Sequence, residues 1–330
     1  MTDQTPTPQP AQPAPAEGWF RALRDAVSAE VEQVVVGQQR ALDLLLIALG
    51  CGGHALFEGV PGVAKTLLAA TAAQALGLEF RRAQFTPDML PSDLTGTMTL
   101  RAGELVFRPG PVFAQILLAD EINRTPPKTQ AALLEAMQEG QVTIDGSSHR
   151  LPHPFLVVAT QNPLEYEGTY PLPEAQLDRF LLKVDVGYPN EDDEVRIVSQ
   201  PRRGSAVSNP VAARTVRGDM AQIATTIQAE VQATHVAADV ARYAVAIVRA
   251  TRNLPAVEVG ASPRAGVHLV AVAKASARLA GRAFVTPDDL AWAAEPVLAH
   301  RLRLRPEAEL DRFRPADAVA AALKTVPIPR

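Results

Sequence analysis

The sequence has one cysteine, little net charge and no long apolar run in its 330 residues. Because Cys51 has no second cysteine to pair with, an internal disulfide is excluded and a reducing compartment is expected. A formal net charge of −4 offers no general surface for nucleic acid or for an acidic membrane. The apolar stretch at residues 41–50 contains Asp43 and is too short to cross a bilayer. We therefore expect a cytoplasmic protein with no membrane insertion and no nucleic-acid partner.

Composition divides the chain into segments. Residues 1–17 are rich in Pro, Gln, Ala and Thr, and they lack the positive start and apolar core of a secretory signal, so we predict a disordered N-terminal tail. Hydrophobic residues make up 47% of the chain, which is long enough for two domains with their own cores. We assign residues 18–187 to an αβα domain, 188–220 to a linker or the start of a second domain, and 221–330 to an alanine-rich helical domain.

Residues 55–66 are an apolar strand followed by a glycine-bearing loop that ends in Lys-Thr. Such a loop lets backbone N–H groups approach phosphates at the start of a helix, with Lys65 on the β/γ-phosphates and Thr66 on Mg²⁺. Ala64 stands where the usual pattern has glycine, and because it adds only a methyl group we expect the loop to persist. The predicted nucleotide-binding residues of this segment are Gly59, Val60, Pro61, Gly62, Val63, Ala64, Lys65, Thr66 and Leu67.

A second apolar run, residues 116–119, is followed directly by Asp120 and Glu121. A strand of this kind is typical of a parallel sheet buried on both faces. A phosphate loop needs a carboxylate for Mg²⁺, which we assign to Asp120, and a group to polarise the attacking water, which we assign to Glu121. The simpler alternative is a strand that ends in two solvated charges.

A third apolar run, residues 155–160, leads to Asn162. Ligands of open parallel sheets bind at the carboxyl ends of the strands, so Asn162 could orient the water between Glu121 and the γ-phosphate. The alternative is a turn residue before Pro163. Together with apolar segments near 54–58, 79–84 and 181–186, these runs predict a five-stranded sheet covered by helices.

Four segments of this chain resemble the MoxR group of AAA+ ATPases, over roughly residues 30–305. They are Val34-Val35-Val36-Gly37-Gln38, the loop at 59–66, Asp120-Glu121-Ile122-Asn123-Arg124 and Leu177-Asp178-Arg179-Phe180. An alanine before the lysine is common in that group. The resemblance implies an α/β fold, in which a P-loop AAA+ parallel-sheet nucleotide domain is followed by a smaller all-α lid domain.

The resemblance also implies roles for residues outside the phosphate loop. Gly37 and Gln38 would lie beside the adenine. Arg179 matches the arginine finger that reaches the γ-phosphate of a neighbouring subunit, with Arg124 as the second choice. The alternative for Arg179 is a surface arginine paired with Asp178.

Ser262-Pro263-Arg264 resembles the sensor-2 motif, in which an arginine at the start of a lid helix touches the γ-phosphate. A helix cap explains Ser262 and Pro263 but leaves Arg264 unexplained, and its contact could be made in cis or in trans. A later helix should begin near Thr286. For the cations His300-Arg301 we expect the simplest arrangement, a helix end with a solvated charged face.

Two insertions interrupt the alternation of strands and helices. Residues 85–111 are too irregular for a simple crossover helix, and residues 141–153 alternate around Asp145-Gly146 as a β-hairpin does. The family has a helix-2 insert and a pre-sensor-1 hairpin at these points. In a ring they would face the pore or the partner, which makes them candidates for client contact.

We therefore expect an ATPase with ATP and Mg²⁺ as cofactors, the metal being held by Thr66 and Asp120. The resemblance implies a homo-oligomer, a hexameric ring, that remodels or matures a protein and works with a von Willebrand factor A domain partner. Three alternatives remain open: a magnesium-chelatase-like ATPase subunit, a nucleic-acid motor and a small-molecule P-loop kinase.

Overall fold

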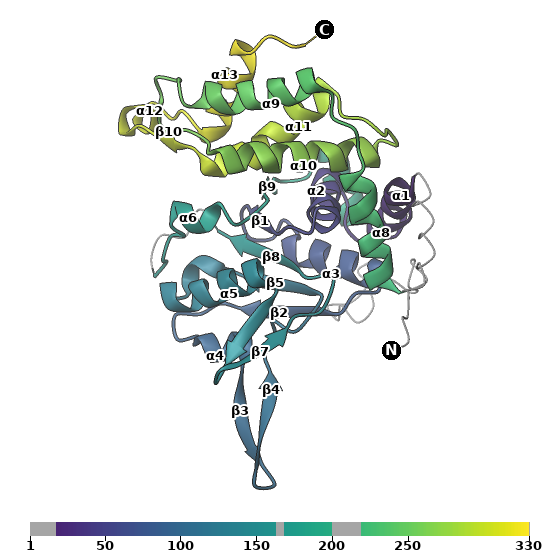
Figure 1. The fold of residues 1–330 in the computed structure, drawn as a ribbon, viewed down its shortest axis with the longest axis vertical. Helices are drawn as coiled ribbons and strands as arrows, with labels where there is room; N and C mark the ends of the chain where they lie inside the picture. Colours follow the sequence, from purple (N-terminus) through teal and green to yellow (C-terminus); the bar gives the residue numbers. More distant parts are fainter. Residues whose placement is uncertain (1–17, 163–167, 200–218, 330) are drawn as a thin grey trace, which may run out of the picture.

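The structure is a computed structural model that describes residues 18–162, 168–199 and 219–329 (Figure 1). The predicted tail at 1–17 and most of the predicted linker at 188–220 lie outside the described residues. Among the described residues, no helix is long and apolar enough to cross a membrane.

A five-stranded parallel sheet forms the centre of the first domain. Its strands are β1 (Ala55–Glu58), β2 (Phe80–Gln84), β5 (Ile116–Asp120), β8 (Leu156–Gln161) and β9 (Leu182–Asp185). They lie in the order β2-β5-β8-β1-β9, and every neighbouring pair is parallel. The predicted strands are confirmed to within a residue or two at each end. Their apolar sequences reflect burial on both faces, which leaves the polar residues at the strand ends.

Helices cover both faces of this sheet. They are α1 (Trp19–Val31), α2 (Gln39–Gly50), α3 (Lys65–Leu76) and α5 (Pro127–Glu139), with the short α4 (Pro91–Thr95), α6 (Glu174–Leu177) and the 3₁₀ turn η1 (Ile122–Arg124). Successive residues of β5 face opposite layers: Leu118 packs in the core layer that contains Leu68 of α3, and Leu117 in the layer that contains Leu133 of α5.

The two insertions are both β-hairpins. The first consists of α4 and the antiparallel strands β3 (Gly96–Arg101) and β4 (Glu104–Pro109), and it projects far from the body of the protein (Figure 1). The second pairs β6 (Gln141–Ile144) with β7 (Ser147–Arg150), as the alternation around Asp145-Gly146 predicts.

The second domain is helical, and most of it lies at the top of Figure 1, above β1 and β9. Its helices are α8 (Met220–Gln232), α9 (Ala238–Thr251), α10 (Pro263–Leu279), α11 (Pro287–Leu298), η2 (Ala299–Arg301), α12 (Pro306–Leu310) and α13 (Pro315–Thr325), and α7 (Glu191–Ser199) lies in the segment predicted as a linker. One short antiparallel pair, β10 (Val257–Val259) with β11 (Arg303–Leu304), is added to the helices. The helix expected near Thr286 begins with a capping box formed by Thr286 and Asp289.

Helix α8 joins the two domains. It packs against α1 and α2 of the first domain and against α10 of the second. Near its end the buried carboxylate of Glu230 accepts hydrogen bonds from the backbone N–H groups of Gly18 and Phe20, at 3.1 and 3.0 Å. These are orphan donors at the start of α1, so Glu230 satisfies them and fixes that helix against α8.

Candidate active site

The loop between β1 and α3 is shaped by close backbone packing. A Cβ atom on Gly59 would lie 2.3 Å from the carbonyl oxygen of Val186, so only glycine fits this approach of the loop to the end of β9. Ala64, the last residue before the helix, has φ 65° and ψ 23° in the left-handed region. A left-handed residue at a helix start turns successive N–H groups toward one point, which is the geometry of an anion-binding nest.

Lys65 begins α3 and folds its side chain back over this loop. Its ammonium group donates hydrogen bonds to the carbonyl oxygens of Gly59 and, at 3.4 Å, of Val60. Burial lowers the pKa of Lys65, and the negative charges of Asp120 and Glu121 partly oppose this effect. The negative charges of Asp120 and Glu121 therefore act on the Lys65 ammonium group, so the acidic pair and the phosphate loop interact electrostatically.

Asp120 and Glu121 share a hydroxyl group of the neighbouring strand. Thr160 Oγ1 donates to Asp120 Oδ1 at 2.6 Å and accepts from the backbone N–H of Glu121 at 2.8 Å. Glu121 has φ 58° and ψ 51°, a left-handed conformation that costs about 1–2 kcal/mol in a residue other than glycine. Strain of this kind clusters at functional sites, and here it falls on the residue predicted to polarise the attacking water.

Both carboxylates also have partners on β2 and η1. Arg82 contacts Asp120, and Gln84 Nε2 donates to Glu121 Oε2 at 2.7 Å. Arg124 Nη1 lies 3.3 Å from the same oxygen of Glu121. No sequence pattern singles out Arg82 or Gln84, since their relation to the acidic pair depends on β2 lying next to β5.

The three predicted strand ends meet at one edge of the sheet. Strands β1 and β5 both pair with β8, so the phosphate loop, Asp120 and Asn162 follow adjacent strands. Asn162 is 5% exposed, and it interacts with other residues of the protein. This burial places the Asn162 side chain inside the protein, and its role as a sensor of the phosphate rather than a turn residue before Pro163 stays a prediction.

The donor set suits Mg²⁺. This ion commonly keeps several waters and takes one or two protein oxygen ligands together with substrate phosphates, and the hydroxyl of Thr66 and the carboxylate of Asp120 are ligands of that kind. Among the described residues, no group of three His, Cys, Asp or Glu side chains could hold a metal ion by itself. One hydroxyl and one carboxylate fit a metal ion whose other ligands are waters and phosphate oxygens.

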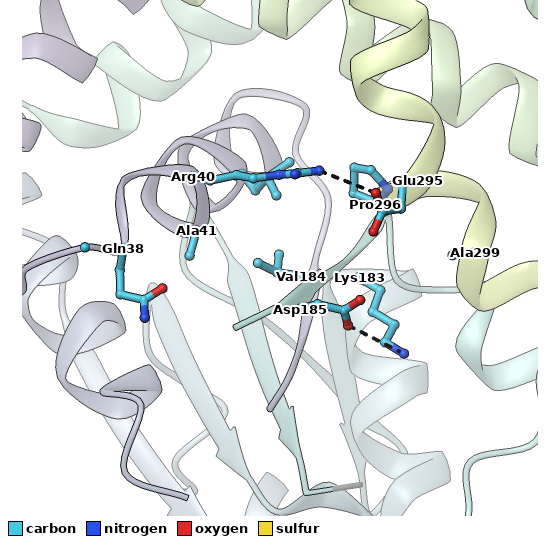
Figure 2. A pocket seen from close by; sticks show the side chains of 11 residues that line it. Gln38, Arg40, Ala41, Lys183, Val184, Asp185, Glu295, Pro296 and Ala299 are labelled. Atoms are coloured by element: carbon cyan, nitrogen blue, oxygen red, sulfur yellow. Dashed lines mark ion pairs between the residues drawn. The ribbon is translucent and has the colours of Figure 1, made fainter. Parts of the chain in front are cut away.

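Gly37 and Gln38 lie on the other side of β9, at the junction with the second domain. Gly37 has φ 78°, and a Cβ atom there would lie 2.8 Å from Asp193 Oδ2. Gln38 Nε2 donates to the carbonyl oxygen of Gly187 at 3.2 Å. Both residues line a cavity of about 110 Å³ bounded by α2, β9 and α11, where Arg40 and Glu295 approach to 3.9 Å (Figure 2).

Asp178, the residue before Arg179 in the chain, pairs with cations of the second domain. Arg264 Nη1 is 3.8 Å from Asp178 Oδ2, although the two residues come from different domains. Arg301 Nε is 2.7 Å from Asp178 Oδ1. Asp178 thus pairs with two cations of the second domain, and within the described part of the chain Arg179 forms no ion pair. The pairing of Arg179 with Asp178, considered from the sequence, is absent.

The helix end expected at His300-Arg301 is present, but the solvated face is not. The Arg301 side chain is 3% exposed, and the half-buried His300 has Nε2 3.4 Å from the carbonyl oxygen of Phe180. Burial lowers the pKa of His300 well below its usual value. The end of α11 is therefore a contact between the domains. No local sequence pattern marks this contact, because its partners lie more than a hundred residues earlier.

Comparison with known proteins gives a consistent result. Residues 54–182 match the family model described as "ATPase family associated with various cellular activities (AAA)", and residues 249–322 match the AAA lid domain. The chain is 42% identical to Chaperone MoxR1 of Mycobacterium tuberculosis, over 97% of this chain and 86% of that protein. It is 35% identical to Protein MoxR of Paracoccus denitrificans, over 94% and 97%. The crystal structure of a putative ATPase from Cytophaga hutchinsonii superposes with a TM-score of 0.86 at 41% identity, covering 94% of this chain and 96% of that one.

Proposed function

This chain belongs to the MoxR family of AAA+ ATPases, and we propose that it uses Mg²⁺-dependent ATP hydrolysis to remodel or mature a partner protein as a chaperone does. The observation that carries the proposal is the meeting of the phosphate loop, the Asp120-Glu121 pair and Asn162 at one edge of the sheet. A helical lid contacts the same domain. Hydrolysis can then do mechanical work, because two bodies are available whose relative angle it can change.

Each side chain of the site has a role that its position supports. Lys65 would exchange its contacts with the loop carbonyls for the β/γ-phosphates. Mg²⁺, bound through Thr66 and Asp120, would neutralise charge on those phosphates. Glu121 would polarise the attacking water, and the buried amide of Asn162 would orient it. Asp120 is held in place for this role by Thr160.

The cavity in Figure 2 is the proposed site of the adenine. Gly37 and Gln38 line it, and Gln38 ties this loop to the segment that follows β9. Because α11 closes the cavity from the second domain, a base bound here would contact both domains. Nucleotide binding would therefore bias the angle of the lid.

We propose a hexameric ring in which Arg179 completes the site of the neighbouring subunit. Its lack of an ion-pair partner among the described residues supports this role, since an arginine finger must be available to a phosphate outside its own subunit. Arg264 pairs with Asp178 of its own subunit at 3.8 Å, and its proposed contact with a γ-phosphate is in cis or in trans. Arg124 is paired with Glu121 of its own subunit, which favours Arg179 over Arg124 as the finger.

The proposed partner is a protein with a von Willebrand factor A domain, as the family resemblance implies. The β3–β4 hairpin supports a partner-binding role, because it projects from the body (Figure 1). The apolar side chains of Leu100 and Leu105 near its end are exposed. The β6–β7 hairpin is the second proposed contact.

Capture of cellular partners on Glu121→Gln protein, held with ATP, tests the function. This variant should bind ATP without turning it over, and so retain its partner. Lys65→Ala is the matched control, because it removes the phosphate contact and should retain neither ATP nor partner. Recovery of a von Willebrand factor A protein with Glu121→Gln alone is the expected result. Recovery of DNA or RNA would instead favour a nucleic-acid motor, and normal ATP affinity of Lys65→Ala would refute the assigned phosphate site.

A further inference from the structure

Arg301 is a buried cation at the contact between the two domains. Its side chain is 3% exposed, which is unusual for arginine unless every donor has a partner. Burial lowers its pKa, and the hydrogen bond to Asp178 opposes that effect. The group stays charged, because arginine is not deprotonated in proteins. A buried charge is stable only when neighbouring groups pair with it and accept its hydrogen bonds.

The guanidinium is bound to the loop that carries Arg179. Nε donates to Asp178 Oδ1 at 2.7 Å, and Nη2 donates to the carbonyl oxygens of Phe180 at 2.6 Å and of Asp178 at 3.3 Å. Nη1 donates to the carbonyl oxygen of Leu181 at 3.3 Å. These acceptors lie directly before and after Arg179 in the chain. The backbone on both sides of Arg179 is therefore held by one side chain of the lid.

The same guanidinium is fixed on the lid side. Nη1 donates to the carbonyl oxygen of Val297 in the last turn of α11, and Nη2 donates to His268 Nδ1 at 2.7 Å. His268 is on α10, so Arg301 links two lid helices to the loop. Because the planar guanidinium of Arg301 has this many partners, it cannot rotate without losing several charge-assisted hydrogen bonds. A displacement of the lid is therefore passed on to the loop that carries Arg179.

Phe180 completes the attachment of the loop. It is fully buried in the core layer between the sheet and α5, so the loop is fixed in the nucleotide domain immediately after Arg179. Arg179 itself is half-buried and has no side-chain hydrogen bond within the described residues. Its backbone is thus held from two domains while its guanidinium is not engaged.

We propose that Arg301 is a positioning residue through which each subunit's lid holds its own Arg179 in place for the ATP site of the neighbouring subunit. This inference rests on the proposed role of Arg179 in trans. It adds a direction of coupling: a nucleotide that moves the lid of one subunit moves, through Arg301, the group that acts on the next subunit's γ-phosphate.

The first test is the kinetics of Arg301→Ala. Loss of alignment of a reacting group by about 1 Å costs about 10²-fold in rate, so kcat should fall by roughly that factor while the affinity for ATP stays unchanged. Arg301→Lys keeps the positive charge but lacks the planar guanidinium with its five donors, so it should give an intermediate rate. Arg242→Ala is the matched control, since Arg242 is an exposed lid arginine whose ion pair is with Asp239 of its own helix. It should behave as the unmodified protein.

Mixed rings separate positioning of Arg179 from damage to the subunit's own site. Rings of Arg301→Ala with Lys65→Ala subunits should recover ATPase, because Lys65→Ala supplies an intact Arg179 to the ATP site of Arg301→Ala. Rings of Arg301→Ala with Arg179→Ala should not recover, because neither subunit supplies a well-placed finger. Native mass spectrometry would verify that the rings are mixed.

Each contrary outcome has a distinct meaning. Recovery with Arg179→Ala would overturn the proposal, because Arg301→Ala would then still provide a working finger. No recovery with Lys65→Ala would also overturn it, since the damage would lie in the subunit's own site. The control mixture of Lys65→Ala with Arg179→Ala tests the proposed function separately: if it does not recover, the trans role of Arg179 is wrong and the inference falls with it. Amide hydrogen exchange in residues 177–182 provides a further readout, and it should rise in Arg301→Ala but not in Arg242→Ala.

Discussion

Arg82 of β2 holds Asp120 of β5 through two nitrogens, with Nε 2.9 Å and Nη2 2.7 Å from the carboxylate oxygen Oδ2. The register of the sheet explains the contact. Gln84 lies opposite Asp120, and Arg82, two residues earlier on β2, has its side chain on the same face. A cation of the protein therefore lies on the carboxylate that we propose for Mg²⁺.

Arg82→Ala should lower the Mg²⁺ concentration that gives half-maximal ATPase activity. The guanidinium uses one oxygen of Asp120 and repels a second cation, so its removal relieves both effects. The measurement is a Mg²⁺ titration of steady-state turnover at saturating ATP. Arg81→Ala is the control, because Arg81 projects to the opposite face and pairs with Glu79 at 2.9 Å. A half-maximal concentration that is unchanged or higher in Arg82→Ala would show that the contact only orients Asp120.

Ala64→Gly should stabilise the protein while ATP affinity is retained. Ala64 is in the left-handed region with φ 65°, which costs about 1–2 kcal/mol for a residue with a Cβ atom. Glycine removes that cost, although the greater freedom of the unfolded chain offsets about 0.4–1 kcal/mol of it. We expect a net gain between about 0 and 1.6 kcal/mol in the free energy of unfolding. Chemical denaturation measures this quantity.

A glycine at Ala70 provides the contrast. Ala70 lies inside α3, where glycine should cost about 1 kcal/mol relative to alanine. Opposite signs for the two substitutions would confirm that the left-handed conformation decides the effect at Ala64. A loss of stability in both variants would mean that the loop gains nothing from glycine.

The sequence was sufficient for the sheet and for the ends of its strands. The run at 116–119 is apolar because β5 is buried on both faces. Asp120 ends the strand and is itself buried, with its carboxylate bound by Thr160. Local patterns of this kind report burial directly. The phosphate loop was equally visible, since its glycines and its Lys-Thr ending are adjacent in the chain.

Residues whose partners are distant in sequence could not be found in this way. Arg301 reaches Asp178 across 123 positions, and at the end of a helix a cation has an ordinary explanation in the helix dipole. Arg82 and Gln84 alternate with their neighbours on an edge strand, which is the pattern of solvated residues. Only the strand order, with β2 beside β5, shows that they contact the acidic pair.

Buried His54 should make the free energy of unfolding depend on pH. Its Nδ1 accepts from the backbone N–H of Val157 at 3.0 Å, and Nε2 lies 3.1 Å from the carbonyl oxygen of Met137, an arrangement that only the neutral ring can make. Burial lowers the pKa of His54 to about 4. The unfolded chain, with a pKa of about 6.5, binds more protons between these values, so stability is complete above about pH 6.5 and is lost as pH falls toward 4.

The expected loss attributable to His54 is about 3 kcal/mol across that range, at about 1.4 kcal/mol for each pH unit between the two pKa values. Chemical denaturation at pH 7.5, 6 and 5 would measure it. His54→Gln should flatten the dependence, because the amide does not titrate. An equally steep loss of stability in His54→Gln would assign it to other groups.

The end of the β3–β4 hairpin should bind the partner without contributing to hydrolysis. Leu100 and Leu105 lie opposite each other on the two strands and are 73% and 68% exposed. Replacing both by serine therefore removes little buried area from the subunit, and basal ATPase and thermal stability should not change. A leucine that becomes buried at an interface contributes about 1.5–3 kcal/mol. The double substitution should accordingly weaken partner binding by about tenfold or more for each leucine.

The measurement is the affinity of the partner captured on Glu121→Gln, compared with the affinity when that variant also carries the two serines. Leu310→Ser on α12 is the matched control, since Leu310 is 84% exposed and lies on the lid, away from the hairpin. Weaker binding with the hairpin serines alone would place the partner on β3–β4. Equal affinity in all three proteins would exclude this hairpin and leave β6–β7 as the proposed contact, because Leu100 and Leu105 are the side chains that a partner seated on the first hairpin would have to bury.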